Sequence, residues 1–154
     1  MFRHIEIRSG GQTGVDRGAL DAALEIGAEC GGWCPEGRTA EDGPIPDRYP
    51  MTELVGGGYP ERTRRNVEDS DGTLILHFGP LSAGTLFTLQ LCEELLKPVC
   101  LIDGSVVGAV EAAARAQEFV IENDIRRLNV AGPRASHSAR AHDYARDVVR
   151  RFFA

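Results

Sequence analysis

The stretch with the clearest chemical potential is the glycine-rich segment SGGQTGVDR, residues 9–17. It follows a short alternating apolar segment and precedes an apolar run with helical spacing, so it is predicted to join a strand to a helix. In such a turn, exposed backbone N–H groups and the positive end of the helix dipole can hold phosphate. The segment lacks the lysine of a Walker loop and the spacing of GxGxxG. The predicted ligand-binding residues of this turn are Gly10, Gly11, Gln12, Thr13 and Gly14.

A second loop of the same kind is GPLSAGT, which follows the apolar segment 72–78. Its predicted ligand-binding residues are Gly79, Ser82, Gly84 and Thr85. In open α/β sheets, ligands bind where neighbouring loops part at the carboxyl ends of the strands. The two loops together therefore predict a clamp for an anionic ligand. The alternative is that both are tight turns without a ligand.

Charged and aromatic side chains near these loops are further candidates. Asp16 lies in the first helical turn, where it can cap the helix, accept a hydroxyl hydrogen bond from a sugar or hold a bridging cation. Arg17 can neutralise that carboxylate or bind the ligand. Trp33 can stack on a planar ring and Arg38 can bind its anionic groups, although structural packing is the alternative for Trp33. Arg48 and Tyr49 are similar candidates for charge and stacking.

A third strand-to-helix turn, NVAGPRAS at 129–136, can border the same crevice, or Ser136 can be an ordinary N-cap. Asp69 and Asp71 precede a strand and are predicted to be turn and cap residues at the opposite edge.

Four segments with strand character are each followed by a segment with helical spacing, which predicts parallel strands. They are 4–8 with the helix that ends at Gly27, 72–78 with 85–96, 99–102 with 106–121, and 127–131 with 136–153. A short strand is expected near 30–34, and 35–65 is predicted to be a long structured loop. The fold class is α/β: a Rossmann-like, doubly wound and mainly parallel sheet in a three-layer α/β/α arrangement, with residues 1–154 as a single domain.

The protein is acidic, with a formal net charge of −6 and a pI of about 5.2. Broad nucleic-acid binding is therefore not expected, and any anion must be bound locally. The first residues do not resemble a signal peptide and no apolar run is long enough to span a membrane, so a cytoplasmic protein without membrane contact is expected. The four cysteines are expected to be free thiols, and no metal site is predicted because their spacing matches no zinc motif.

Four long strings closely resemble the molybdenum cofactor carrier family, also described as circularly permuted relatives of YpsA. They are SGGQTGVDRGALDAAL, GGWCPEGRTAEDGPIPDRYP, RTRRNVEDSDGTLIL and GPLSAGT, in order over about the first 100 residues. The resemblance implies a Rossmann-like superfamily that also contains the lysine-decarboxylase-like phosphoribohydrolases and the DprA proteins. It implies a nucleotide or the molybdenum cofactor (molybdopterin) as the small anionic ligand, and a homo-oligomer.

The resemblance leaves the question of catalysis open. The phosphoribohydrolases carry PGGxGTxxE in the second loop, where Gly84 and Thr85 match but Thr88 stands at the glutamate position. A carrier or nucleotide-binding protein is therefore the leading hypothesis. The alternatives are a nucleotide-processing hydrolase that cleaves an N-glycosidic or phosphate bond with Asp16, Glu41 or Asp42 as the acid, and an interaction module that binds no small molecule.

Overall fold

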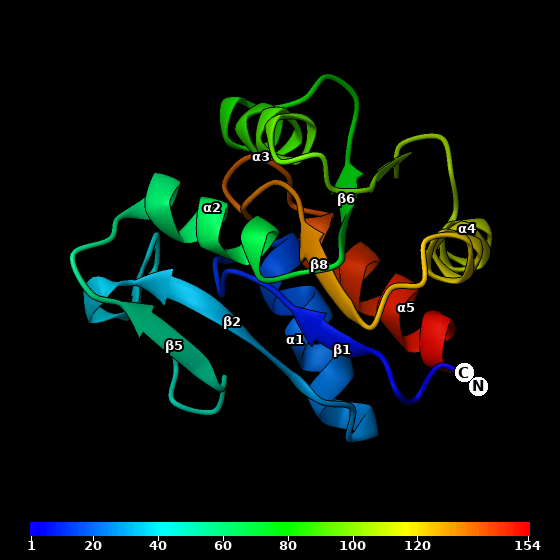
Figure 1. The fold of residues 1–154 in the computed structure, drawn as a ribbon, viewed down its shortest axis with the longest axis horizontal. Helices are drawn as coiled ribbons and strands as arrows, with labels where there is room; N and C mark the ends of the chain where they lie inside the picture. The colour runs from blue at the N-terminus through cyan, green and yellow to red at the C-terminus, as the bar shows by residue number, and fades with distance from the viewer.

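The computed structural model describes residues 1–154, and its centre is a sheet of six strands in the order β5-β2-β1-β8-β6-β7. Every neighbouring pair in this sheet is parallel, as the repeated strand-then-helix pattern predicts (Figure 1). The strands are β1 (Glu6–Arg8), β2 (Cys30–Pro35), β5 (Met51–Leu54), β6 (Gly72–His77), β7 (Val99–Asp103) and β8 (Arg127–Ala131). The helices are α1 (Val15–Ile26), α2 (Tyr59–Glu68), α3 (Ala83–Glu94), α4 (Ala109–Glu122) and α5 (Ala141–Phe153). The α/β fold class is confirmed.

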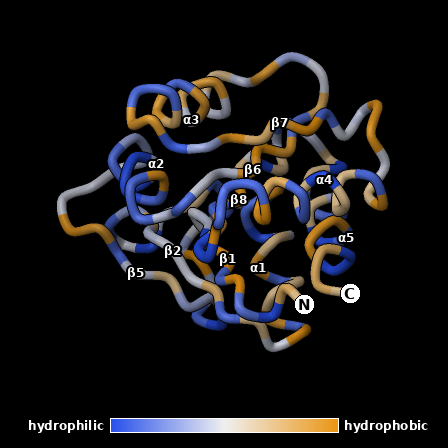
Figure 2. Tube along the Cα trace, turned by 45° about the vertical axis from the view of Figure 1, so that its right-hand side comes forward, coloured by the Kyte–Doolittle hydropathy of each residue, from blue (hydrophilic) through white to orange (hydrophobic).

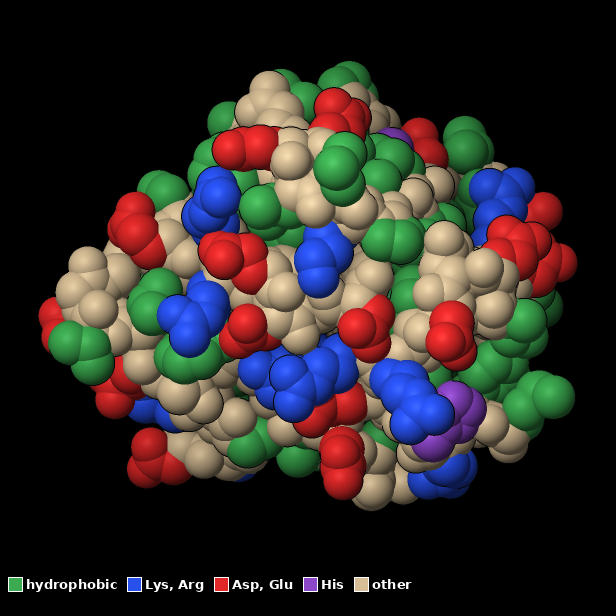
Figure 3. All heavy atoms as spheres, in the orientation of Figure 1, with side chains coloured by type: hydrophobic (Ala, Val, Ile, Leu, Met, Phe, Trp, Pro, Cys, Tyr) green, Lys and Arg blue, Asp and Glu red, His purple; other side chains and the backbone are tan.

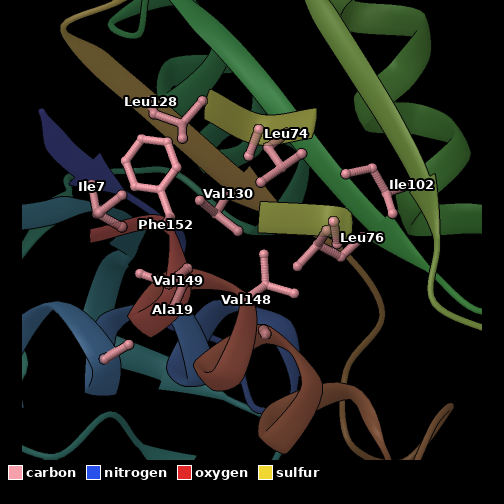
Figure 4. Packing of buried hydrophobic residues seen from close by; sticks show 14 of the residues in the cluster. Ile7, Ala19, Leu74, Leu76, Ile102, Leu128, Val130, Val148, Val149 and Phe152 are labelled. Carbon is pink, nitrogen blue, oxygen red and sulfur yellow. The ribbon is translucent and has the colours of Figure 1, made fainter. Parts of the chain in front are cut away.

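The main core lies between the sheet and the layer formed by α1, α4 and α5. Figure 4 shows Ile7, Leu74 and Val130 of the central strands facing Val148 and Phe152 of α5. Because side chains alternate along a strand, Ile75 points to the other face of the sheet and is also fully buried. The apolar run of β6 is thus covered on both faces, which is why it shows no alternation in the sequence.

Helices α2 and α3 contact one another and cover part of the second face of the sheet. In Figure 2 the residues of α2 are coloured mainly as hydrophilic, whereas those of α3 are a mixture of hydrophilic and hydrophobic. Nearly all residues of α2 are polar, with Val67 its single buried apolar side chain. Apolar packing on this face therefore comes mainly from α3, through Leu91 and Cys92.

Helices α1 and α5 pack very closely. A Cβ atom added at Gly18 of α1 would lie 2.2 Å from the backbone oxygen of His142 in α5. Only glycine allows this approach, which places the amino end of α1 against the first turn of the C-terminal helix.

The prediction of a continuous loop at 35–65 is wrong. The segment contains a 3-10 turn at Glu36–Arg38, a hairpin of β3 (Thr39–Ala40) and β4 (Gly43–Pro44), the edge strand β5 and helix α2. The two short strands are below the length at which alternation can be recognised, and α2 has too few apolar residues for a helical period. The last helix also begins at Ala141 and not at 136. No helix combines the length and apolarity that crossing a membrane requires.

Candidate functional site

A cleft of about 220 Å³ opens at the carboxyl ends of β1, β6 and β8. Of its 20 lining residues only 4 are hydrophobic, so it is suited to a polar ligand. The lining comes from three loops that each follow a strand, and from the first two turns of α2. The lining includes Gly10, Gln12, Asp16, Tyr59, Arg62, Ser82, Gly84, Thr85, Phe87, Thr88, Asn129, Arg134 and His137.

The floor of the cleft contains the carboxylate of Asp16 and the guanidinium of Arg62. Asp16 and Arg62 are only 8% and 7% exposed, and Arg62 Nη1 donates to the backbone oxygen of Gly10 at 2.5 Å. Burial raises the pKa of Asp16, and the charge of Arg62 opposes this rise. Burial also lowers the pKa of Arg62, although an arginine stays charged throughout the ordinary pH range. A carboxylic acid with a raised pKa in a cleft is a frequent mark of a functional site.

Gln12 has a fixed orientation beside this pair. Its Oε1 accepts hydrogen bonds from the backbone N–H groups of Thr13 and Glu41, both at 3.0 Å. Nε2 must therefore be the remaining donor, and it is buried without any partner. An unsatisfied buried donor in a polar cleft costs free energy unless a ligand or water accepts its hydrogen bond.

The amino end of α3 forms another wall. Ser82 is the N-cap residue, and its side chain donates to Thr85 Oγ1 and not to the helix backbone. The first N–H groups of a helix have no intrahelical acceptor, so those of Ala83, Gly84 and Thr85 are free to bind an anion. A Cβ atom added at Gly84 would meet nothing within 4 Å, so the backbone there borders open space.

The ring of Tyr59 lies close to two cations of the cleft lining, Arg62 and Arg134. The guanidinium carbons of Arg62 and Arg134 are each 5.3 Å from the centre of the Tyr59 ring. Phe87 lines the cleft from α3. Together with His137, these residues give the cleft more basic than acidic groups, although the protein as a whole is acidic. Figure 3 shows that basic and acidic side chains are interspersed on the face of the molecule drawn there.

The predicted residues Gly10, Gln12, Asp16, Ser82, Gly84 and Thr85 all line this cleft. Others belong to its supporting structure. A Cβ atom on Gly11 would point at Ile45, and one on Gly14 would lie 2.4 Å from the backbone oxygen of Pro133. These two glycines let other loops approach the β1–α1 loop and do not face the cleft.

Thr13 and Ser136 meet at Glu41, which lies between the short strands β3 and β4. Both hydroxyl groups donate to the Glu41 carboxylate, and Arg134 lies nearby. Burial alone would raise the pKa of Glu41, but the hydrogen bonds from Ser136 and Thr13 and the charge of Arg134 together outweigh it and lower the pKa. Thr13 therefore links the β3–β4 hairpin to two loops of the cleft, and Glu41 is poorly suited to act as an acid.

Arg17, Trp33, Arg38 and Gly79 lie outside the lining of the cleft. Arg17 forms a bidentate ion pair with Asp42, which lowers the Asp42 pKa. Arg38 donates to backbone oxygens of its own loop, at Ile45, Pro46 and Tyr49.

The Trp33 indole donates to Asp69 at the end of α2, and Arg65 stacks on its ring at 4.3 Å. These contacts agree with structural packing, the alternative considered for Trp33. Asp69 and Asp71 are turn and cap residues, as predicted. Asp69 is the C-cap of α2, and Asp71 accepts hydrogen bonds from the backbone N–H groups of Arg126 and Arg127.

Sequence reasoning missed the contribution of α2, which brings Tyr59, Arg62 and Asn66 to the cleft. A signal was present: Pro60 stands at the start of the helix, and the side chain of Glu61 accepts a hydrogen bond from the Gly58 N–H at 2.8 Å. In addition, Arg64 and Arg65 of the basic run RTRR are followed four positions later by the acidic residues Glu68 and Asp69.

All four cysteines are free, as predicted, and burial raises the pKa of each thiol. No three side chains of histidine, cysteine, aspartate or glutamate gather as a set of metal ligands.

Comparison with known proteins identifies the family of the chain. Residues 7–153 match the model of the circularly permutated YpsA SLOG family. A solved structure from Syntrophus aciditrophicus SB, named "Putative molybdenum carrier protein", is 40% identical with a TM-score of 0.94, over 97% of this chain and 94% of that one. Comparison with curated proteins gave no match. The chain belongs to the circularly permuted YpsA family of SLOG proteins.

Proposed function

We propose that the protein binds a small phosphate-bearing ligand, a nucleotide or molybdopterin, in the cleft at the carboxyl ends of β1, β6 and β8. The observation that carries the proposal is the concentration of anion-binding groups there in a protein of net charge −6. The free N–H groups of α3, the hydroxyl groups of Ser82 and Thr85, and the cations Arg62 and Arg134 all border one polar space.

The name of the Syntrophus protein supports a carrier role for this fold, and molybdopterin combines a ring with a phosphate. The cleft offers a place for each part. Tyr59 and Phe87 are aromatic side chains that can contact a ring, and the amino end of α3 can bind the phosphate. We therefore assign to Tyr59 the ring contact that the sequence suggested for Trp33.

Thermal unfolding tests the proposal. The ligands are guanosine and adenosine 5′-monophosphates, pyrophosphate and molybdate, each titrated into the purified protein. A ligand at 100 times its Kd adds about 2.7 kcal/mol to the free energy of unfolding, which raises Tm by roughly 2 to 6 °C for a domain of this size. At least one of the phosphate compounds should produce such a shift.

Arg134→Gln should weaken the shift, because a half-buried cation at the cleft is lost while the core is untouched. Arg150→Gln is the matched control, since Arg150 is exposed on α5 and its distance to Glu25 is 3.9 Å. A Tm that no compound changes would contradict the proposal. If Arg134→Gln and Arg150→Gln change the ligand-induced Tm shift equally, the ligand binds outside this cleft.

A second candidate function is supported by the raised pKa of Asp16. Of the three acids considered from the sequence, Glu41 and Asp42 are held ionised by their partners, whereas Asp16 lies on the cleft floor. Asp16 is therefore the one suited to donate a proton to a leaving group. We propose N-glycosidic cleavage of a nucleotide as this alternative, to be tested by chromatography of free base. Release by the wild type that Asp16→Asn abolishes would support it, and absence of free base would exclude it.

A further inference from the structure

The floor of the cleft has a defined hydrogen-bonding pattern, made by Gln12, Asp16 and Arg62. All three are at least nine-tenths buried, and all line the cleft. Asp16 and Arg62 converge beside Gly10, where a Cβ atom would lie 2.5 Å from Arg62 Nη1 and 2.9 Å from Asp16 Oδ2. Gln12 is joined to the same carboxylate oxygen through its backbone N–H. The absence of a side chain at Gly10 leaves room for both the carboxylate and the guanidinium beside its backbone.

Each of these side chains keeps unused capacity. Gln12 Nε2 is a buried donor without a partner, because Oε1 already accepts two backbone N–H groups. Arg62 donates through Nη1 to Gly10 and through Nε to Thr63, which leaves Nη2 as a second donor. Asp16 accepts one hydrogen bond from the Gln12 N–H through Oδ2, and a carboxylate can accept several. The floor therefore offers two donors next to one acceptor.

This pattern is complementary to a ring edge that presents an oxygen acceptor beside N–H donors. Guanine has such an edge, with O6 as acceptor and the 2-amino group as donor, whereas adenine places an amino donor where guanine has the oxygen. Pterins share the 2-amino-4-oxopyrimidine unit with guanine. An adenine amino group would instead face the Gln12 and Arg62 donors and leave them unsatisfied, which is costly in a buried site.

We infer that the cleft floor selects ligands with a 2-amino-4-oxopyrimidine edge, the edge common to guanine nucleotides and pterins. Asp16 accepts from the ring N–H and the 2-amino group, and Gln12 and Arg62 donate to the ring oxygen. The inference rests on the proposed function and adds the class of ring to it. The amino end of α3 and Arg134 remain the groups that bind the phosphate.

Isothermal titration with guanosine, inosine and adenosine 5′-monophosphates tests the selectivity. Guanosine monophosphate should bind at least about tenfold more tightly than adenosine monophosphate, equivalent to about 1.4 kcal/mol. Inosine monophosphate keeps the oxygen and the ring N–H but lacks the 2-amino group, so its affinity should lie between the two. Competition with 6-hydroxymethylpterin then distinguishes the sources of the edge: displacement of the nucleotide shows that both rings bind at the cleft floor, whereas binding of the pterin without binding of any nucleotide identifies a pterin site.

Substitution Asp16→Asn provides a gain-of-binding test. An amide can donate to an oxygen at the ring position where guanine carries its amino group, and xanthine has that oxygen. The wild type should prefer guanosine over xanthosine 5′-monophosphate, and Asp16→Asn should reverse the preference. Arg134→Gln is the matched control, because loss of a phosphate contact should weaken both nucleotides alike.

Gly10→Ala is a second variant should Asp16→Asn fail to fold. Its Cβ would meet side-chain atoms of Arg62 and Asp16 and not backbone, and the position has no positive φ. It should lower the affinity for guanosine monophosphate more than that for adenosine monophosphate. Measurable but equal affinities of the wild type for these two nucleotides, or an unchanged preference in Asp16→Asn, would overturn the inference and leave the proposed function intact. Failure of all phosphate compounds and the pterin to bind would overturn both.

Discussion

At the scale of residues, the glycines of the β1–α1 loop have different tasks. Gly10 leaves space at the cleft floor, whereas Gly14 allows the loop after β8 to approach. The φ of Gly14 is +84°, and an added Cβ would lie 2.4 Å from the Pro133 oxygen and 2.8 Å from the Ala135 nitrogen. A side chain at position 14 is therefore opposed both by the backbone conformation and by backbone atoms that cannot move independently.

We predict that Gly14→Ala lowers the free energy of unfolding by about 3 kcal/mol or more, the upper part of the usual range for single substitutions. Gly27→Ala is the matched control, because Gly27 has a φ of +75° but open space around its Cβ position. It should cost only the left-handed strain of about 1–2 kcal/mol. Urea unfolding of the three proteins measures both effects. Equal losses of stability would show that the contact with the Pro133 loop is unimportant.

The same residue scale shows what the sequence could predict of the candidate site. Strand-to-helix loops with glycine and small hydroxyl residues carry their own signature, so Gly10, Gly84 and Thr85 were identifiable before their positions were known. Trp33 was not placed correctly relative to the cleft, because its direction depends on the register of β2 and on the position of α2. Side-chain direction of this kind is a tertiary property that the spacing of residues does not contain.

At the scale of elements, α2 explains most of what sequence reasoning missed. Its sequence YPERTRRNVE has almost no apolar period, so the usual signal for a helix is absent. It is held instead by polar contacts: the Asn66 side chain exchanges two hydrogen bonds with the backbone of Trp33, at 2.8 and 3.0 Å. The parallel sheet was predictable because its strands are apolar runs between helices, whereas a polar helix that contacts a strand edge was not.

The junction of α1 and α5 should make stability depend on pH. His142 Nε2 lies 2.7 Å from Asp21 Oδ2 and Nδ1 lies 2.9 Å from Asp143, while the Tyr49 hydroxyl donates to the other Asp21 oxygen. Partial burial alone would lower the pKa of His142, but the two carboxylates outweigh it and the pKa is raised. A group with a raised pKa in the folded state stabilises the fold when protonated, and this contribution is lost as pH rises through the folded pKa.

We therefore expect wild type to exceed His142→Gln in Tm by more at about pH 5.5 than at about pH 8.5, on either side of the ordinary histidine pKa. Differential scanning calorimetry of both proteins at the two pH values measures this difference. Asp143→Asn should reduce the pH dependence without removing it, because Asp21 remains. A Tm difference that stays constant or grows with pH would show that the His142 ion pairs do not stabilise the α1–α5 junction.

At the scale of the whole molecule, the final strand determines where the cleft lies. β8 is the last strand in the chain but pairs with β1 on one side and β6 on the other. The loops that follow these three adjacent strands consequently meet at one edge of the sheet, which is the general location of ligand sites in open α/β sheets. Placing β8 in the centre also brings α5 back beside α1 and the C-terminus back to the N-terminus.

The closeness of the two ends gives the last prediction. Figure 1 and Figure 2 both draw the termini side by side, and the rings of Phe2 and Phe152 are 5.0 Å apart. A short flexible linker should therefore join Ala154 to Met1 without strain, and new ends can be opened in the exposed turn between Asn123 and Asp124. That turn precedes β8, at the edge of the sheet opposite to the cleft.

Such a circular permutant should retain the far-ultraviolet circular dichroism spectrum, a cooperative thermal transition and the same ligand-induced Tm shift as the original chain. Opening the chain between Gly84 and Thr85 instead is the informative comparison, because it divides the amino end of α3. That second permutant should fold less stably and lose the ligand-induced shift. Failure of the first permutant to unfold cooperatively would show that the covalent order around the α4–β8 turn is needed for folding, whereas an undiminished shift in the second would place the ligand away from α3.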